Sequence, residues 1–327
     1  MEKPDLQQAL GPLASLYNDP EVMEIMVDSP AQIFIERHNK IEETNVHFDS
    51  KESLTVFIKT LFELVGAGFT EEQTINESSL GKTSHMVAAL PPTAVDGPYI
   101  VIRKFIKRAL NWDDLINWNS ISREAFDFIK VALAKHLNIL VAGGTNSGKT
   151  TLMNMVAELI PSDERLVIVE GIEELHIQHP RLIELSAGHP VSVTKEDLLN
   201  TASKMRPDWI IINELQGSEV MRVLEIMSRG YSAMTTIHAT SCEDALTRLE
   251  TMCLMGNLGL GLAEIRILIA SAIQMITFQK WMPDRSRKML DIVELRGVEN
   301  DRYILQPLFQ FDNVQEKLLS TGIAPSW

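Results

Sequence analysis

The feature that most constrains this chain is a glycine-rich stretch that directly follows a short apolar run. Residues 138–142 read Asn-Ile-Leu-Val-Ala, and residues 143–150 read Gly-Gly-Thr-Asn-Ser-Gly-Lys-Thr. The second stretch fits the pattern G-x-x-x-x-G-K-[ST], in which glycines let the backbone curl so that its N–H groups point at phosphate oxygens. A helix that starts near Lys149 would add the positive end of its dipole. The sequence therefore predicts a strand, a phosphate-binding loop and a helix in succession.

Positions of this loop have expected roles in holding a nucleotide. Lys149 is expected to reach the β and γ phosphates of ATP, and Thr150 is expected to hold Mg²⁺. The alternative is a chance glycine-rich turn, and the flanking strand and helix argue against it. The predicted nucleotide-binding residues are Gly143, Gly144, Thr145, Asn146, Ser147, Gly148, Lys149 and Thr150.

The part of the chain from about residue 120 onward alternates apolar runs with helical patterns. Unbroken apolar runs suit strands that are buried on both faces of a parallel sheet. The expected strands cover residues 138–142, 166–169 and 209–212. The expected helices cover residues 122–135, 150–159, 195–204, 218–229 and 262–276. This alternation predicts an α/β domain with right-handed crossovers.

The first hundred residues have a different pattern of short helices and strands. Apolar residues at helical spacing predict helices at 6–17 and 51–65, and Asn18-Asp19-Pro20 predicts a turn and the start of another helix. Strands are expected at 32–37 and 99–105. The predicted organisation is a smaller α+β domain over residues 1–106, a linker over 107–119, and the α/β domain over 120–327.

Length, composition and charge agree with two globular domains. The chain has 327 residues, of which 45% are hydrophobic, enough for two cores. Its formal net charge of −14 argues against binding DNA by bulk electrostatics, so no direct contact with nucleic acid is expected. The densest basic segment, residues 103–108, has two open interpretations: a local basic patch or a solvated turn between domains.

The cysteines and the apolar segments bear on the compartment. Cys242 and Cys253 form neither a metal-ligand spacing nor a disulfide framework, which favours a reducing environment. The N-terminus lacks the basic and apolar regions of a signal peptide, and no apolar stretch is long enough to span a bilayer. A cytoplasmic location is therefore predicted, and any membrane contact is expected to be peripheral or through a partner protein.

Acidic residues and one histidine follow three of the expected secondary-structure segments. Glu214, after the strand 209–212, is placed to bind Mg²⁺ through water or to orient the attacking water; the alternative is a cap on the next helix. Glu170 and Glu174, after the strand 166–169, suggest a site for metal or for attacking water, or else carboxylates at a helix start. His238, in the polar run 235–240, is a candidate sensor of the γ-phosphate or an ordinary hydrogen-bonded loop residue.

These groups, in this order and at these spacings, resemble the type II/IV secretion ATPase superfamily, and most of all its Tad/CpaF-type pilus assembly and conjugative-transfer ATPases. The resemblance covers nearly the whole chain. The segments that carry it are the Walker A motif at 143–151, the acidic box at 170–175, the Walker B region at 206–217, the His box at 236–239, Ala245–Glu250, and several N-terminal segments including Phe34–Arg37 and Ile102–Phe105.

The resemblance implies more than the residues alone. It adds Thr151 to the nucleotide-binding loop, and it assigns catalytic parts to Glu214, Glu174, Glu170 and His238. It implies a RecA-like P-loop NTPase domain preceded by a PAS-like domain, with arginines of the latter, Arg103 first, helping to hold the phosphates. It also implies a homo-oligomer, a hexameric ring, that works with a secretion or pilus platform protein of the inner membrane.

Several positions depart from the family pattern. Gly171 stands where a carboxylate is usual, and Gln216 and Lys204 stand where arginines are usual. The segment before Pro91, which contains an arginine in the family, is shorter in this chain and contains no arginine. Lys82 or Arg108 is a candidate replacement for that arginine. Two interpretations therefore stay open: an active ATPase motor for pilus assembly or macromolecule export, and a slow or non-hydrolysing ATP-binding regulatory or scaffold paralogue. A P-loop kinase of small molecules does not fit the His box.

Overall fold

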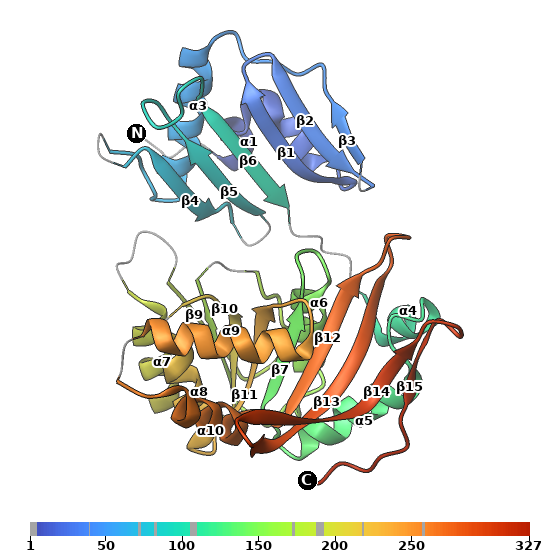
Figure 1. Cartoon of the computed structure of the whole chain (residues 1–327). Helices are drawn as coiled ribbons and strands as arrows, with labels where there is room; N and C mark the ends of the chain where they lie inside the picture. The colour runs from blue at the N-terminus through green and yellow to red at the C-terminus, as the bar shows by residue number, and fades with distance from the viewer. Residues whose placement is uncertain are drawn as a thin grey trace. The chain divides into compact units, whose positions relative to one another are not determined.

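A computed structural model shows two compact units, which are described separately (Figure 1). The first is formed by residues up to Lys104, and the second by most of the residues from Leu110 onward. The structure describes residues 5–38, 40–70, 73–81, 84–104, 110–171, 174–187, 193–217, 219–256 and 259–327.

The first unit is one antiparallel sheet with helices on one face. The strand order is β3-β2-β1-β6-β5-β4. Its core contains Ile25 and Ile102 of the sheet together with Leu54 and Ile58 of the long helix. Its elements are α1 (Leu6–Ala9), the 3₁₀ turn η1 (Gly11–Leu13), α2 (Ala14–Asn18), β1 (Val22–Ser29), β2 (Gln32–Arg37), β3 (Lys40–Glu43), α3 (Lys51–Leu64), β4 (Ile75–Ser79), β5 (Ser84–Ala89) and β6 (Tyr99–Lys104).

Local sequence explains why the helices of this unit begin and end where they do. Ser50 caps α3 by accepting from the backbone N–H of Ser53, and the Ser53 side chain accepts in return from Ser50. The helix expected at 6–17 is instead split into three short turns, because Gly11 adopts a left-handed φ of +44°. The helix expected to start at Pro20 is wrong, since strand β1 begins at Val22.

The second unit is built on a nine-stranded sheet of order β15-β14-β13-β12-β7-β11-β10-β8-β9. The strands from β12 to β9 in this order are parallel, and β13, β14 and β15 continue the sheet as an antiparallel meander. Its elements are α4 (Trp112–Asn117), α5 (Arg123–Ala134), β7 (Ile139–Gly143), α6 (Lys149–Ala157), β8 (Leu166–Glu170), β9 (Leu182–Ser186), α7 (Lys195–Lys204), β10 (Trp209–Leu215), α8 (Glu219–Ser228), β11 (Ser232–His238), α9 (Cys242–Met255), α10 (Leu262–Ala272), β12 (Met275–Trp281), β13 (Arg287–Glu299), β14 (Arg302–Asp312) and β15 (Lys317–Ser320).

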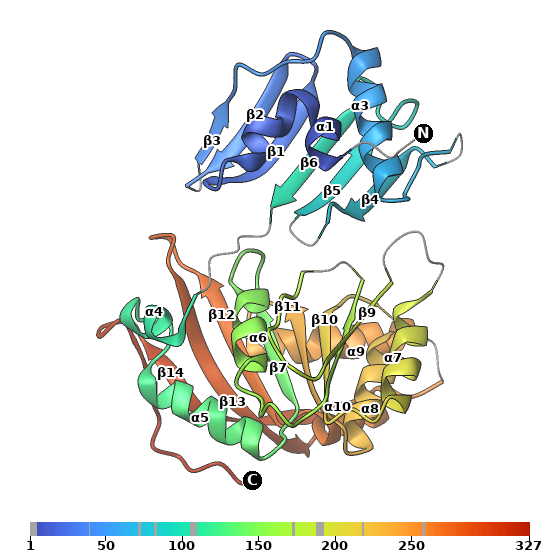
Figure 2. The same ribbon diagram turned by 180° about the vertical axis from the view of Figure 1, so that it is seen from behind.

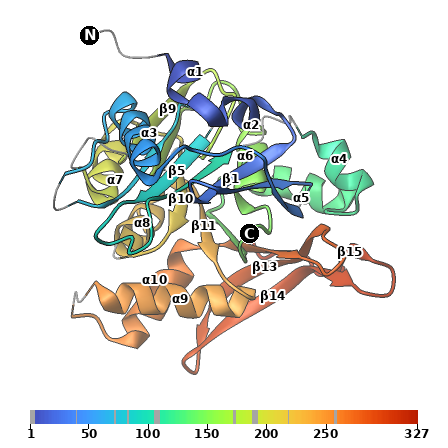
Figure 3. The ribbon, with the colours of Figure 1, turned by 90° about the horizontal axis from the view of Figure 1, so that it is seen from above.

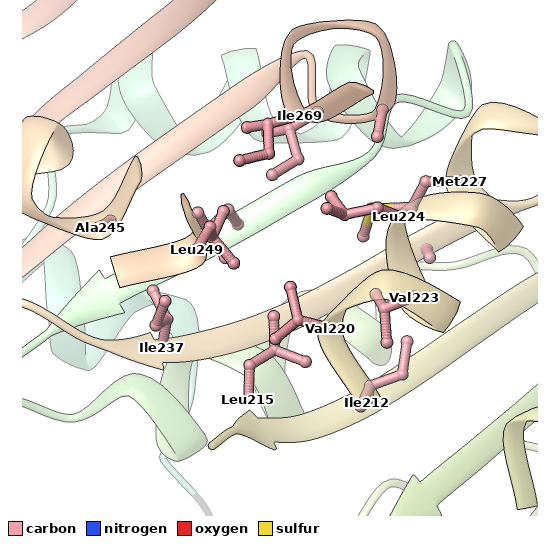
Figure 4. Close-up of a cluster of buried hydrophobic side chains, with 14 of the residues drawn as sticks. Ile212, Leu215, Val220, Val223, Leu224, Met227, Ile237, Ala245, Leu249 and Ile269 are labelled. Atoms are coloured by element: carbon pink, nitrogen blue, oxygen red, sulfur yellow. The ribbon is translucent and has the colours of Figure 1, made fainter. Parts of the chain in front are cut away.

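The alternation of side chains along each strand divides the interior into two cores. Leu140 and Ala142 of β7 pack with helices α7 to α10, whereas Ile139 and Val141 pack with α5 and α6 on the opposite face. Figure 4 shows the first of these cores, and the views from behind and from above show the helices on the two faces (Figures 2 and 3). Burial on both faces explains the unbroken apolar runs of the strands.

Several segments differ from the expectation. The segment proposed as a linker contains α4, whose Trp112, Leu115 and Ile116 pack against the second core. The helix expected over 262–276 ends at Ala272, and β12 starts at Met275. Strands β9, β11, β13, β14 and β15 were not predicted. Among the described residues, no helix combines the length and the apolar character that crossing a bilayer requires.

Candidate functional site

The phosphate loop connects the end of β7 to the start of α6, as the motif predicts. Gly148 and Asn146 both have left-handed backbones, with φ of +95° and +60°. A Cβ added at Gly143 would lie 2.5 Å from both the backbone oxygen of Gln279 and the hydroxyl oxygen of Ser147. Glycine is therefore required at 143 by close approach of neighbouring atoms, and at 148 by conformation.

The side chains of the loop differ in how far they are buried. Lys149 is only 8% exposed, and its Nζ donates to the carbonyl oxygen of Gly144 at 2.9 Å. Thr150 is half-buried, while Thr151 is exposed in the first turn of α6. The hydroxyl oxygen of Ser147 is buried and has no hydrogen-bond partner within the described ranges. The exposed part of the loop consists of Gly144, Thr145 and Asn146.

The order of the strands gathers the predicted residues at one edge of the sheet. Strands β7, β11, β10 and β8 are parallel neighbours, so their carboxyl ends lie side by side. His238 at the end of β11 is the register partner of Gly143. Glu214 lies near the end of β10, and Glu170 ends β8. This edge therefore carries the phosphate loop, the histidine and two carboxylates.

Glu214 is held through both its backbone and its side chain. Its φ of +47° is left-handed, at an irregularity in the pairing of β10 with β11. The hydroxyl oxygen of Thr236 accepts from its N–H at 3.0 Å, and Lys195 Nζ donates to its carbonyl oxygen at 2.8 Å. Its Oε1 lies 3.1 Å from Nε2 of His238, and neither side chain is fully buried. The carboxylate of Glu214 is therefore paired with the imidazole of His238 at the end of the neighbouring strand.

The two acidic residues predicted after β8 differ in environment. Glu170 is 3% exposed, and its Oε1 accepts from the backbone N–H of Leu175 at 2.9 Å. Its carboxylate thus ties the last residue of β8 to Leu175, and this contact was not predicted. Glu174, which clusters with the first unit, is half-buried. The intervening part of the predicted acidic box, residues 172–173, lies outside the described residues.

The arginine predicted to assist from the N-terminal half lies on β6 in the first unit. Arg103 forms an ion pair with Glu24 of the neighbouring strand β1, at 3.2 Å, and its side chain is 56% exposed. Lys82 and Arg108, the candidate replacements for a missing arginine, lie outside the described residues.

Three residues near the loop were not among the predicted site residues. Lys195 and Thr236 hold the backbone of Glu214. Arg287, at the start of β13, donates from Nε to the carbonyl oxygen of Asn146 at 2.8 Å. Lys195 and Arg287 lie far along the chain from the residues they contact, so no motif spacing could have indicated them. Thr236 belongs to the polar run and to the His box named above, but no role was predicted for it.

The residues at this edge fit a nucleotide with Mg²⁺. The loop leaves open space at Gly144, where an added Cβ would meet no atom within 4 Å. Ser147 offers a buried hydroxyl oxygen that has no hydrogen-bond partner among the described residues. No group of three or more His, Cys, Asp or Glu side chains arranged to hold a metal occurs in the part of the chain that the structure describes. Mg²⁺ retains waters and takes one or two protein oxygens together with phosphate oxygens, and Thr150 and Glu214 are the residues that would supply them.

The mixed α/β architecture matches solved ATPase structures. DotB from Legionella pneumophila aligns with a TM-score of 0.64 and 18% identity, covering 91% of this chain and 84% of that chain. The pilus retraction motor PilT, solved with bound ADP, aligns with a TM-score of 0.61 and 14% identity, covering 98% of this chain and 84% of that chain. At these identities the likeness concerns the fold.

Comparison of the sequence with known proteins identifies the family. The chain belongs to the type II/IV secretion system protein family, whose profile matches residues 7–305. The conjugal transfer protein TrbB of Rhizobium radiobacter is 27% identical over 305 residues, covering 91% of each protein. The type IV secretion system protein VirB11 of Brucella suis is 28% identical over 283 residues, covering 76% of this chain and 78% of the relative. The resemblance read from the motifs is thereby confirmed.

Proposed function

We propose that this chain binds ATP with Mg²⁺ at residues 143–151 and hydrolyses it to drive macromolecule export or pilus assembly. The observation that carries the proposal is the shared edge of four parallel strands, where the phosphate loop adjoins Glu214 and His238. A nucleotide γ-phosphate held by the loop would lie beside a carboxylate that is ready to orient water. Phosphoryl transfer depends chiefly on such positioning and on charge stabilisation.

Each residue has a definite task in this scheme. The loop amides and Lys149 bind the phosphates, and Lys149 would leave its contact with Gly144 to do so. Thr150 and, through water, Glu214 would hold Mg²⁺, which neutralises phosphate charge when bound. Glu214 orients the attacking water, and His238 senses the γ-phosphate through its contact with Glu214. Glu170 and Glu174 shape and charge the adjacent turn.

The proposal extends to the whole assembly. We take the second unit as a RecA-like P-loop NTPase domain and the first as a PAS-like domain, with residues 1–106 and 120–327 as the domains and Arg103 as a phosphate-binding arginine. A homo-oligomeric ring, a hexamer, would work in the cytoplasm against an inner-membrane platform, with peripheral membrane contact. Support comes from the family and from relatives named for conjugal transfer and type IV secretion.

A second function is a slow or non-hydrolysing ATP-binding regulator of such a motor. The observation that favours it is the environment of two positions that depart from the family pattern. Gln216 is exposed after β10. At Gly171, Cε of the Lys195 side chain lies 3.1 Å from the point where a Cβ would stand. Loss of one arginine that stabilises the transition state can lower the rate about 10³-fold or more.

Steady phosphate release by the purified full chain decides between the two functions. It should be measured with Mg²⁺ and ATP, with and without lipid vesicles, alongside the variant Lys149→Ala. Fast release by the wild type that the variant lacks supports the motor. Tight nucleotide binding with slow release supports the regulator. Absence of affinity for ATP and ADP in the wild type would refute both.

A further inference from the structure

The hairpin formed by β12 and β13 reaches the phosphate loop through one side chain. Arg287 is the first residue of β13 and pairs across the hairpin with Trp281, the last residue of β12. The carbon of its guanidinium lies over the Trp281 ring, 5.4 Å from the ring centre, within the range of a cation–π contact. From this position Nε donates to the carbonyl oxygen of Asn146 at 2.8 Å.

This contact fixes a peptide group in the middle of the loop. The peptide that joins Asn146 to Ser147 has its carbonyl held by Arg287, and its N–H donates to the carbonyl oxygen of Gly144 at 3.3 Å. A peptide plane that is bonded at both ends cannot flip without breaking one of the two bonds. The flip would matter here, because it would change ψ of Asn146 and φ of Ser147, and Asn146 already occupies the small left-handed region with a φ of +60°.

The stem of the arginine also lies against the loop. A Cβ added at Gly148 would stand 3.3 Å from Cδ of Arg287, so the side chain passes close over the backbone at the start of α6. Arg287 itself is exposed, and its hairpin is closed by a hydrogen bond from the N–H of Met282 to the oxygen of Ser286. The arginine thus braces the loop from outside the core.

We propose that Arg287 is a positioning residue for nucleotide binding: lying over the Trp281 ring, it holds the Asn146 carbonyl so that the loop keeps its phosphate-binding shape. This inference rests on the proposed function for its ligand, but the brace itself exists without a nucleotide. It also assigns a task to the antiparallel meander, which the phosphate-loop motif does not include. The planar guanidinium is needed, because a lysine cannot stack on the ring and donate from the same fixed geometry.

The test compares four variants of the full chain with the wild type. Dissociation constants for Mg-ADP and Mg-ATP would be measured by titration with a fluorescent nucleotide analogue and by displacement. Arg287→Gln should weaken binding about tenfold, since hydrogen bonds from charged donors are worth more than neutral ones. Trp281→Leu should weaken it about threefold, and the double variant should be no weaker than Arg287→Gln alone. Arg287→Lys should fail to restore affinity.

Amide hydrogen exchange over residues 144–150 without nucleotide supplies a readout that ordinary destabilisation would not reproduce. Exchange there should be faster in Arg287→Gln, while exchange in the core strands stays the same. Arg302→Gln is the matched control, because it removes the same charge from an exposed site at the start of β14; it should change neither readout.

The outcomes separate this inference from the proposed function. Affinity within twofold of wild type and unchanged exchange in Arg287→Gln would overturn the positioning role. Wild-type affinity in Arg287→Lys would show that a positive charge is sufficient, and it would overturn the requirement for a planar guanidinium. A wild type that binds no nucleotide would overturn the proposed function, and the exchange comparison would still decide whether the brace holds the loop.

Discussion

Nε2 of His238 lies 3.1 Å from Oε1 of Glu214, although the two residues come from different strands. The pair exists because β10 and β11 are adjacent and parallel, and because Glu214 leaves the regular strand path with a left-handed backbone. The imidazole donates an N–H to the carboxylate when the ring is charged, or when it is neutral with its proton on Nε2. The carboxylate that would orient water is therefore already held in one direction before any nucleotide arrives.

Replacement of the carboxylate tests its role directly. Glu214→Gln keeps the shape of the side chain and can keep a hydrogen bond to His238, but it cannot draw a proton from water. We expect the turnover number for ATP to fall about 100-fold or more, with the dissociation constant of ATP within a few-fold of wild type. Single-turnover phosphate release checks the expected fall in rate, and equilibrium nucleotide binding checks the expected dissociation constant. Undiminished turnover would remove Glu214 from the catalytic machinery.

Lys195 offers a test of how the backbone of Glu214 is held. Lys195→Met removes the donor that binds the Glu214 carbonyl at 2.8 Å while keeping most of the apolar stem. We expect turnover to fall about tenfold, consistent with a charge-assisted hydrogen bond, and nucleotide affinity to stay the same. Lys317→Met, on the exposed face of β15, is the control for loss of one positive charge. Equal effects of the two substitutions would contradict the assignment.

The two glycines that open the loop make a matched pair. Gly143→Ala places a methyl group 2.5 Å from a backbone oxygen of β12, which cannot move aside without disturbing the sheet. We expect a loss of about 1–3 kcal/mol in the free energy of unfolding together with weakened nucleotide binding. Gly144→Ala is the control, since a methyl group there meets no atom within 4 Å. Thermal or urea unfolding checks the difference, and equal stability of the two variants would refute the steric argument.

A buried carboxylate predicts how stability depends on pH. Glu294 is 2% exposed; burial works to raise the pKa of its carboxyl, but hydrogen bonds from Ser326 and Arg296 outweigh it and lower the pKa below the ordinary value. A pKa that is lower in the folded state gives stabilisation that is complete above the unfolded value of about 4 and is lost as pH falls through the folded pKa.

The variant Glu294→Gln isolates that contribution. At pH 7 we expect it to lower the free energy of unfolding by about 1–3 kcal/mol, the cost of weakening a buried charged hydrogen-bond network. Between about pH 5 and pH 3 the wild type should lose stability faster than the variant, so that the two unfolding curves converge. Urea unfolding at a series of pH values checks this; parallel curves would show that Glu294 has the same pKa in both states.

The parallel strands β7, β8 and β10 and the loop after β7 were predictable because their signals are local. The runs at 139–142 and 209–212 are buried on both faces and therefore contain no polar interruption. Strand β11 was not predicted, because it contains polar residues. Thr235 and Thr236 are typical of a loop, yet they are 0% and 1% exposed. Thr236 is tolerated there because its hydroxyl accepts from the N–H of Glu214. A polar residue with a buried partner cannot be recognised without that partner.

The residues of the candidate site were predictable, but the residues that hold them in place were not. Gly143–Thr150, Glu214 and His238 follow from motifs, whereas their adjacency depends on the strand order β7-β11-β10-β8, which no spacing along the chain encodes. Lys195 lies 19 residues from Glu214, and Arg287 lies 141 residues from Asn146. The meander of β13 to β15 was missed because half-exposed antiparallel strands have mixed patterns that resemble loops.

Gly143 has a hydrogen-bonded strand on each side, with His238 as its register partner on β11 and Gln279 on β12. The loop that it opens therefore cannot shift as an isolated flap. Any displacement of its first residue strains the strand that leads to the histidine, the strand that leads to the Trp281–Arg287 hairpin, or both. If phosphates bind at this loop as we propose, an event there would be transmitted in two directions across one sheet, to Glu214 and His238 and to the meander of β13 to β15.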